Sequence, residues 1–448
     1  MSRYTSVTER DRREMLDAVG VGSVDDLFVD VPAGVRMGRP LDLPEGRSEQ
    51  EVFAELSALA ARNRHADAEV SFLGAGMYDH YVPAVVDAIV ERSEFLTPYT
   101  PYQPEVSQGT LQAMFEFQTA ISELTGLPVS NASVYEGPSA VAAAGYMAKL
   151  ETRRTRLVVS RGLHPHSRAA LRTHAAGYAM TVDEVPLDER GATHADALAA
   201  AVDGDTAAVF VQQPNFLGTV EDLDALVEAG KRTGALFVCA ADPLPLAILR
   251  PPGEQGADIC VGEGQSLGGR LDFGGPSFGF FAAAERFIRR MPGRIAGETR
   301  DVDGRRGFVL TLQTREQHIR REKATHNICT AQALNALAGV VYLSWLGRRG
   351  AVELAELMLR RTHYAREALG LEPINPGPVV REFAVRVPDL EALRERARAE
   401  GINPGYPLGR DLPEYEDGLL VAITERRTRD DIDRLARVAA SVREGVPA

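Results

Sequence analysis

Lysine is almost absent from this chain. Only three of its 50 lysine and arginine residues are lysine, at Lys149, Lys231 and Lys323. Chemistry that needs a side-chain amine therefore has three positions to choose from. The formal net charge is -13, which excludes nucleic acid and an anionic membrane surface as main partners.

Cysteine is equally scarce, with Cys239, Cys260 and Cys329 as the only three residues. Their spacing fits neither a metal site nor a disulfide framework. We expect all three to be reduced core residues of a cytoplasmic protein. The polar N-terminus predicts no signal peptide, and no apolar run approaches the roughly 20 residues of a membrane span.

The composition is that of a globular protein, with 448 residues, of which 44% are hydrophobic and 25% charged. We predict an N-terminal helical arm over 1–70, a large α/β domain over 71–320 and a smaller C-terminal α/β domain over 321–448. Two helices of the arm are expected to begin with capping boxes, formed by Ser6 with Glu9 and by Ser48 with Glu51.

Short β-branched runs alternate with helix-period segments in the predicted large domain. This alternation indicates crossover connections and a mostly parallel sheet that is covered on both faces. Ligands of such sheets bind at the carboxyl ends of the strands. The strands are expected at 156–160, 179–187, 207–213, 236–242, 258–263 and 278–283.

Three polar features are candidate ligand contacts, and two of them, His164 and Asp242, lie at the ends of predicted strands. A turn-rich loop leads to a helix start at Gly137 and Ser139, which suits a phosphate, although the adjacent Glu136 would oppose an anion and the helix can simply be capped. His164 can stack on a flat cofactor ring or be an ordinary loop histidine. Asp242 can pair with a protonated pyridine nitrogen or cap the next turn.

A Gly-rich loop, "GEGQSLGGRLDFGGPSFGF", follows the next strand, and Gln265 stands 23 positions after Asp242. The order of these features resembles the aspartate-aminotransferase fold (fold type I) of pyridoxal-phosphate enzymes. Enzymes of that fold need a lysine after this strand, and none of the three lysines is at that place. A catalytic role for the isolated chain is therefore not expected.

Longer stretches carry a more specific resemblance. The segments 72–140, 262–282, 320–334 ("RREKATHNICTAQAL") and 421–435 resemble the α subunits of two-subunit glycine decarboxylases, the P-proteins of the glycine cleavage system. One departure is His326, where a smaller residue such as serine is expected.

The resemblance implies an α2β2 enzyme, glycine dehydrogenase (aminomethyl-transferring). Its pyridoxal phosphate is bound by a lysine of the β subunit, and Gln265 replaces that lysine here. Glycine loses CO2, and the aminomethyl group passes to lipoate carried by the H-protein. Gly137, Ser139, His164 and Asp242 would then be vestigial cofactor contacts, and the chain would be inactive alone.

The segment "TPYTPYQPEVSQGT" (97–110) is polar, proline-stiffened and without a period, so it is poor core material. We expect it to line the partner's active site, and the alternative is an interface loop that never meets the ligand. Its proposed lining residues are Tyr99, Tyr102, Gln103, Glu105, Ser107 and Gln108. Two other readings stay open: a non-catalytic scaffold or regulatory subunit, and a free-standing pyridoxal enzyme that uses Lys323.

Overall fold

The computed structural model describes residues 6–329 and 331–443. These residues form two compact units, with the boundary between Arg64 and His65. The first unit corresponds to most of the predicted arm. The further division of the second unit near residue 320 stays a prediction.

The first unit contains the helices α1 (Glu9–Val19) and α2 (Glu49–Ala60), and neither buries a residue. The predicted capping box of Ser48 with Glu51 is present at α2. The one predicted for α1 is wrong, because the helix begins at Glu9 and Thr8 makes the reciprocal bonds with Asp11. Apolar side chains of this unit are exposed, including Phe53 at 74%.

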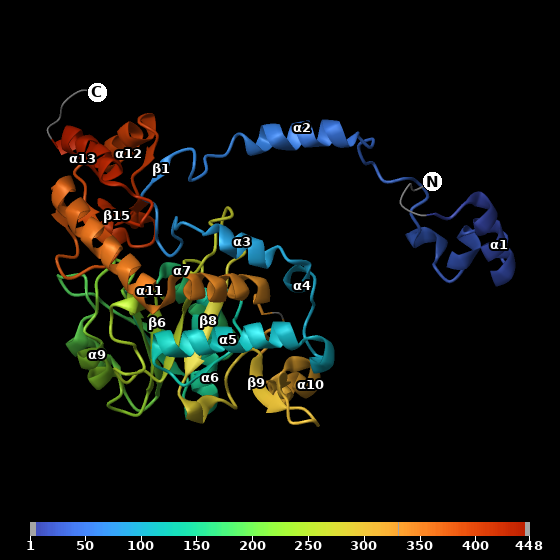
Figure 1. Ribbon diagram of the computed structural model, residues 1–448, viewed down its shortest axis with the longest axis horizontal. Coiled ribbons are helices and arrows are strands. Elements are labelled where there is room, and N and C mark those ends of the chain that lie inside the picture. Colours follow the sequence, from blue (N-terminus) through green and yellow to red (C-terminus); the bar gives the residue numbers. More distant parts are fainter. Residues whose placement is uncertain (1–5, 330, 444–448) are drawn as a thin grey trace. The chain divides into compact units, whose positions relative to one another are not determined.

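The second unit is built on a seven-stranded sheet in the order β2-β8-β7-β6-β5-β3-β4. Strands β3 to β7 are parallel, whereas β8 and β2 pair antiparallel at one edge, as the alternating pattern predicts for most of the sheet. Figure 1 shows this sheet among its helices. Its strands are β2 (Val129–Ser130), β3 (Arg156–Ser160), β4 (Thr181–Val185), β5 (Thr206–Gln213), β6 (Leu236–Ala241), β7 (Ile259–Glu263) and β8 (Gly279–Ala283).

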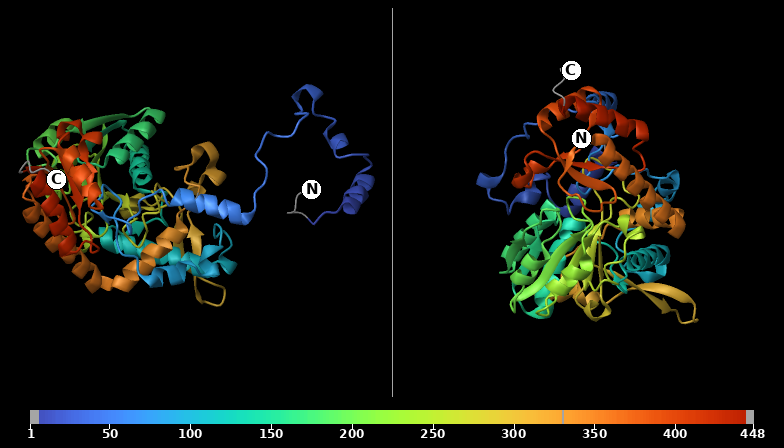
Figure 2. Two further views of the ribbon diagram at one scale, coloured as in Figure 1. Left: turned by 90° about the horizontal axis from the view of Figure 1, so that it is seen from above. Right: turned by 90° about the vertical axis from the view of Figure 1, so that its left-hand side faces the viewer.

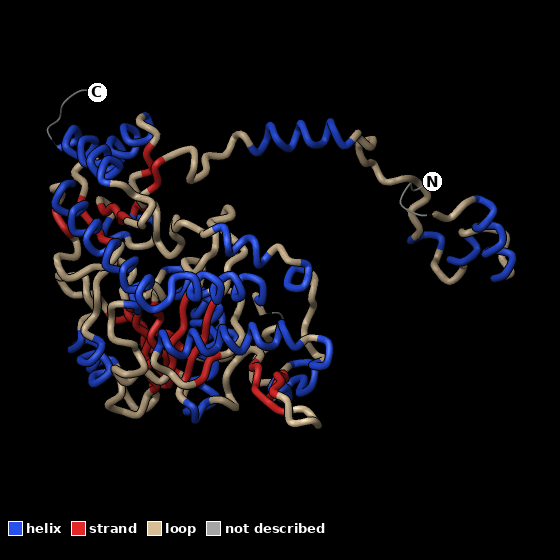
Figure 3. The backbone as a smooth tube through the Cα atoms, in the orientation of Figure 1, coloured by secondary structure: helices blue, strands red, loops and turns tan. Residues whose placement is uncertain are grey.

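Alternate residues of each strand point to opposite sides of the sheet. Both sides carry apolar side chains and are covered by other elements. Val158 of β3 packs with Phe117 in one core, whereas Leu157 packs with Leu171 in the other. Figure 3 shows the strands enclosed by helices in this unit. The helices of the large sheet are α3 (Ala84–Val90), α4 (Ser93–Leu96), α5 (Gln108–Thr125), α6 (Gly137–Thr152), α7 (Pro165–Gly177), α8 (Ala195–Ala201) and α9 (Leu223–Gly230).

The C-terminal elements gather at one end of the second unit, in red in Figure 2. They form an antiparallel sheet in the order β11-β12-β15-β14. The remaining strands and helices are β1 (Val70–Ser71), β9 (Ile295–Arg300), β10 (Arg306–Thr311), β11 (Glu372–Pro373), β12 (Glu382–Arg386), β13 (Ile402–Asn403), β14 (Tyr406–Pro407), β15 (Gly418–Ala422), α10 (Gln317–Arg320), α11 (Ala333–Leu369), α12 (Leu390–Ala399) and α13 (Arg429–Arg443).

The two helices expected at the start of the C-terminal region form the single element α11, which breaks at Gly347 with φ 60° and ψ 179°. Cys239 and Cys260 are buried and free, as expected. Cys329 is free but exposed, so its assignment to the core is wrong. No helix within the described residues combines the length and hydropathy that a membrane span requires.

Candidate functional site

A cavity of about 380 Å³ lies at the carboxyl ends of β6 and β7. It brings together three predicted site residues from distant parts of the chain, Gly137, His164 and Asp242. Ser139 stands in the first turn of α6, and Gln265 is buried beside two lining residues, Glu263 and Ser266. The fold thus positions the cofactor-type residues around one space.

The start of α6, which was expected to suit a phosphate, is filled by two carboxylates. Glu136 caps the helix by accepting from the Ser139 N–H at 3.0 Å. Glu263 accepts from the Gly137 N–H at 2.9 Å and from the Gln265 N–H at 3.0 Å. Burial raises the pKa of Glu263 to about 7. The helix is therefore capped by the chain's own acidic groups, and a phosphate would meet them directly.

Asp242 is paired with a guanidinium of the chain itself. Its carboxylate forms an ion pair with Arg381, which is 3% exposed and comes from just before β12. The Arg381 guanidinium also lies 3.4 Å from the centre of the Tyr78 ring and bonds to His80. Since a buried carboxylate needs one cationic partner, Asp242 already has what a pyridine nitrogen would supply.

His164 is held as a neutral ring. Its Nδ1 accepts from the His166 N–H at 3.1 Å, so the proton lies on Nε2, which donates to the Ala75 carbonyl at 2.9 Å. Burial lowers the pKa of His164 to about 4. Gly76 has φ 100°, and a Cβ there would stand 2.9 Å from His164 Nε2, so this approach requires glycine. The ring therefore caps α7 and fastens the 75–78 loop.

Gln265 also holds the 75–78 loop, through the backbone of Tyr78. Its Oε1 accepts from the Tyr78 N–H at 2.9 Å, and its Nε2 donates to the Tyr78 carbonyl at 3.0 Å and to the Gly269 carbonyl at 2.9 Å. The Tyr78 hydroxyl in turn donates to Glu382 at 2.8 Å. The side chain at the position expected for a cofactor lysine thus holds the backbone at Tyr78 and Gly269 in place.

None of the three lysines, all within the described residues, lines this cavity. Lys149 bonds to the Tyr178 carbonyl, Lys231 pairs with Asp258 at 3.0 Å, and Lys323 is exposed. The donor set does not fit pyridoxal phosphate, because the phosphate position is acidic, the aspartate is neutralised and no amine is in reach.

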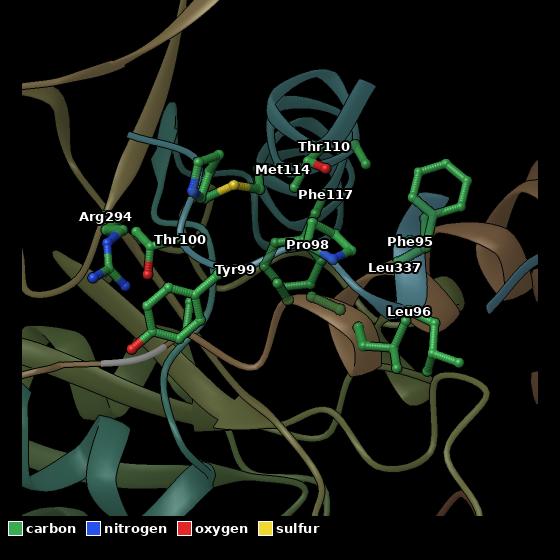
Figure 4. A pocket seen from close by; sticks show the side chains of 16 residues that line it. Phe95, Leu96, Pro98, Tyr99, Thr100, Thr110, Met114, Phe117, Arg294 and Leu337 are labelled. Atoms are coloured by element: carbon green, nitrogen blue, oxygen red, sulfur yellow. The ribbon is translucent and has the colours of Figure 1, made fainter. Parts of the chain in front are cut away.

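No residue of the 97–110 segment lines the cavity of about 380 Å³. Tyr99 is 86% exposed and, with Pro98, borders a slot of about 150 Å³, of which Arg294 forms one end in Figure 4. Tyr102 is half-exposed, and its hydroxyl accepts from Arg294 at 3.1 Å.

The other proposed lining residues differ in their roles. Gln108 is used within the chain, because its amide exchanges hydrogen bonds with the Phe308 backbone of β10 at 2.8 and 2.9 Å. Ser107 precedes α5 without capping it through its side chain, and Gln103 and Glu105 are exposed around a single helical turn, Pro104–Val106. The tyrosines are therefore the better placed groups for contacts outside the chain.

Sequence reasoning missed Glu263 and Arg381. Glu263 is part of the strand end that leads to Gln265, and its acidic side chain beside a glycine-rich loop was the available signal. Arg381 lies 139 positions after Asp242 by sequence number, so no local pattern links the two.

The architecture has counterparts among solved structures of low sequence identity. A sphingosine-1-phosphate lyase from Burkholderia pseudomallei matches with a TM-score of 0.64 at 16% identity, over 92% of this chain and 95% of that one. A NifS-like protein matches with a TM-score of 0.61 at 12% identity, over 84% and 100%. The chain has the fold of the fold type I pyridoxal-phosphate enzymes.

Closer matches define the family. A crystal structure of glycine decarboxylase (P-protein) of the glycine cleavage system, in inhibitor-bound form, has a TM-score of 0.90 at 45% identity and covers 98% of this chain and 100% of that one. Probable glycine dehydrogenase (decarboxylating) subunit 1 of Carboxydothermus hydrogenoformans is 50% identical over 442 residues, 97% of this chain and 99% of that protein.

The protein of the same name from Geobacillus thermodenitrificans is 49% identical over 438 residues, 97% of this chain and 98% of that protein. The sequence profile of the glycine cleavage system P-protein matches residues 2–439. The chain belongs to the glycine cleavage system P-protein family.

Proposed function

We propose that this chain is the α subunit (subunit 1) of a two-subunit glycine decarboxylase, which works with a β subunit in an α2β2 assembly. Together they decarboxylate glycine and pass the aminomethyl group to the lipoyl arm of the H-protein. Pyridoxal phosphate would be bound by the β subunit. The observation that carries the proposal is near full-length identity of about half to proteins named subunit 1.

The pairing of polar groups around the 380 Å³ cavity supports the assignment of the cofactor to the β subunit. Glu263 and Arg381 bond to groups that a cofactor enzyme would keep for its cofactor, and Gln265 stands where such an enzyme would have its lysine. The chain's own pocket is then part of its framework, and its contribution to the reaction comes from its surface.

The 97–110 segment is the proposed contribution to the partner's active site. Tyr99 is exposed and stiffened by Pro98 and Pro101, so its ring is available without a large cost in chain entropy. Tyr102 is oriented by Arg294 and retains exposed surface. These two side chains would position glycine or the cofactor from the α side.

A scaffold role is the second candidate function, and the same internal pairing of the cavity's polar groups favours it. It differs from the first in one respect: a scaffold needs no α residue at the reacting groups. Tyr99→Phe and Tyr102→Phe in the assembled complex separate the two, because only a supporting active-site role makes turnover depend on these hydroxyls.

The test of the proposed function is co-expression with the β subunit, followed by glycine–bicarbonate exchange with and without this chain. We expect exchange only when both chains are present. Exchange by this chain alone, or undiminished exchange by the β subunit alone, would overturn the proposal.

A further inference from the structure

The cavity of about 380 Å³ at the ends of β6 and β7 has room for a small organic molecule, since ligand pockets start at roughly 300 Å³. Two of the residues that line it, His166 and Gly274, are exposed, so the cavity is open to solvent on their side. Its residues do not fit pyridoxal phosphate, and their charge indicates which kind of molecule they fit instead.

The wall of the cavity is more acidic than basic. Three carboxylates line it, those of Glu136, Asp242 and Glu263. Of the described residues in the wall, Arg381 alone carries a guanidinium, and it pairs with Asp242. His164 is neutral, because burial lowers its pKa to about 4. Glu136 and Glu263 therefore face the cavity without a cationic partner in its wall.

Neutral donors hold these two carboxylates in place without balancing their charge. Glu136 accepts from the N–H and the hydroxyl of Ser139. Glu263 accepts from the N–H groups of Gly137 and Gln265. Burial and, to a smaller extent, the charge of Glu136 raise the pKa of Glu263 to about 7. A cation bound between the two carboxylates would relieve their repulsion, and a carboxylate has room for about four hydrogen bonds.

Apolar side chains complete the wall, among them Met77, Pro138 and Val141. Such a lining favours an organic molecule over a hydrated ion. The part of the chain that the structure describes also contains no group of three or more His, Cys, Asp or Glu side chains that could hold a metal ion. The cation that suits this cavity is therefore an organic one with an apolar body.

We propose that this cavity binds a small organic cation, whose ammonium, amidinium or guanidinium group pairs with Glu136 and Glu263. The positive group lies at the helix start that would suit a phosphate if the two carboxylates were absent, so the charge selectivity of the cavity is reversed. The site is made only of residues of this chain, so its binding can be tested apart from the proposed function.

Three aromatic molecules of nearly equal shape test the sign of the charge: the cation benzamidine, the neutral benzamide and the anion benzoate. Calorimetry measures their binding to the full-length chain at pH 8, above the Glu263 pKa of about 7. We expect benzamidine to bind at least about 10-fold more tightly than benzamide, the value of one hydrogen bond to a charged group, and benzoate not to bind. Equal binding of benzamidine and benzamide, binding of benzoate, or no binding of benzamidine overturns the proposal.

Variants locate the binding. Glu136→Gln and Glu263→Gln should each weaken binding of benzamidine about 10- to 100-fold and leave benzamide unaffected. Each keeps the side-chain size and an oxygen that accepts from the helix start, and if one of them fails to fold, the other remains as the test. Glu123→Gln, an exposed glutamate on α5, is the matched control and should bind like the original chain. Unchanged binding of benzamidine in either cavity variant overturns the assignment.

Discussion

Glu263 accepts a hydrogen bond from the Gly137 N–H at 2.9 Å, at the helix start where this fold ordinarily suits a phosphate. A carboxylate of the chain thereby takes the place of a ligand. In the same way, the Arg381 guanidinium pairs with Asp242, which was expected to pair with a pyridine nitrogen.

Gln265→Lys should not give a cofactor-binding chain. The new amine would enter a pocket in which Glu263 still occupies the helix start and Arg381 still holds Asp242. The measurement is visible absorbance of an imine after adding pyridoxal phosphate to the isolated variant. Gln265→Ala serves as the matched control, and it should lower the free energy of unfolding by about 2–4 kcal/mol because three buried hydrogen bonds are lost. Stable imine formation in Gln265→Lys would show that the pocket remains a working cofactor site.

Glu263→Gln should change the pH dependence of stability. Burial raises the pKa of Glu263 to about 7, above its unfolded value, so its contribution to stability is present below about pH 4.5 and is lost as the pH rises through 7. Relative to Glu263→Gln, the original chain should lose up to about 3 kcal/mol over this range.

Urea unfolding between pH 5 and 8 measures this difference, and Glu123→Gln, an exposed glutamate on α5, is the control. Parallel stability curves for the original chain and Glu263→Gln would contradict the buried, partly protonated state of Glu263.

Arg381→Met should be strongly destabilising, by about 3–5 kcal/mol, because it leaves the Asp242 carboxylate without its cationic partner. Adding Asp242→Asn should recover part of the loss, since the amide carries no charge. A double-mutant cycle of unfolding free energies gives the coupling. Additive effects of the two substitutions would mean that the two side chains are not coupled as an ion pair.

Part of this arrangement could be predicted from the sequence. The strand at 156–160 was predicted with its observed bounds, since a short run of apolar, β-branched residues is a local signal. The convergence of Gly137, His164 and Asp242 also followed from strand order.

The pairing of the cavity's polar groups did not follow, because it depends on contacts between remote segments. Arg381 belongs to the C-terminal region and pairs with Asp242 at the end of β6. Gln265 bonds to Tyr78, which is 187 positions earlier in the chain. The capping of α1 was misplaced for a different reason: Ser6 and Thr8 offer equivalent hydroxyls, and the local pattern does not choose between them.

Tyr99→Phe and Tyr102→Phe should each lower turnover of the assembled complex, by about 10- to 100-fold if the hydroxyl positions a reacting group. Assembly should be unchanged, because the Tyr99 ring is almost fully exposed and the substitution removes only an oxygen. Exchange assays and sedimentation of the same samples measure both quantities. Val106→Ala, another exposed side chain in this segment, is the control. Full turnover with intact assembly in both tyrosine variants would favour the scaffold role.

Chemical labelling of the assembled complex shows which chain carries the cofactor. The reconstituted complex is reduced with borohydride, which fixes a lysine imine, and its peptides are mapped. We predict label on the β subunit alone, and none on Lys149, Lys231 or Lys323 of this chain. A labelled lysine in this chain would contradict the conclusion that the polar groups around its cavity are paired with one another and hold no cofactor.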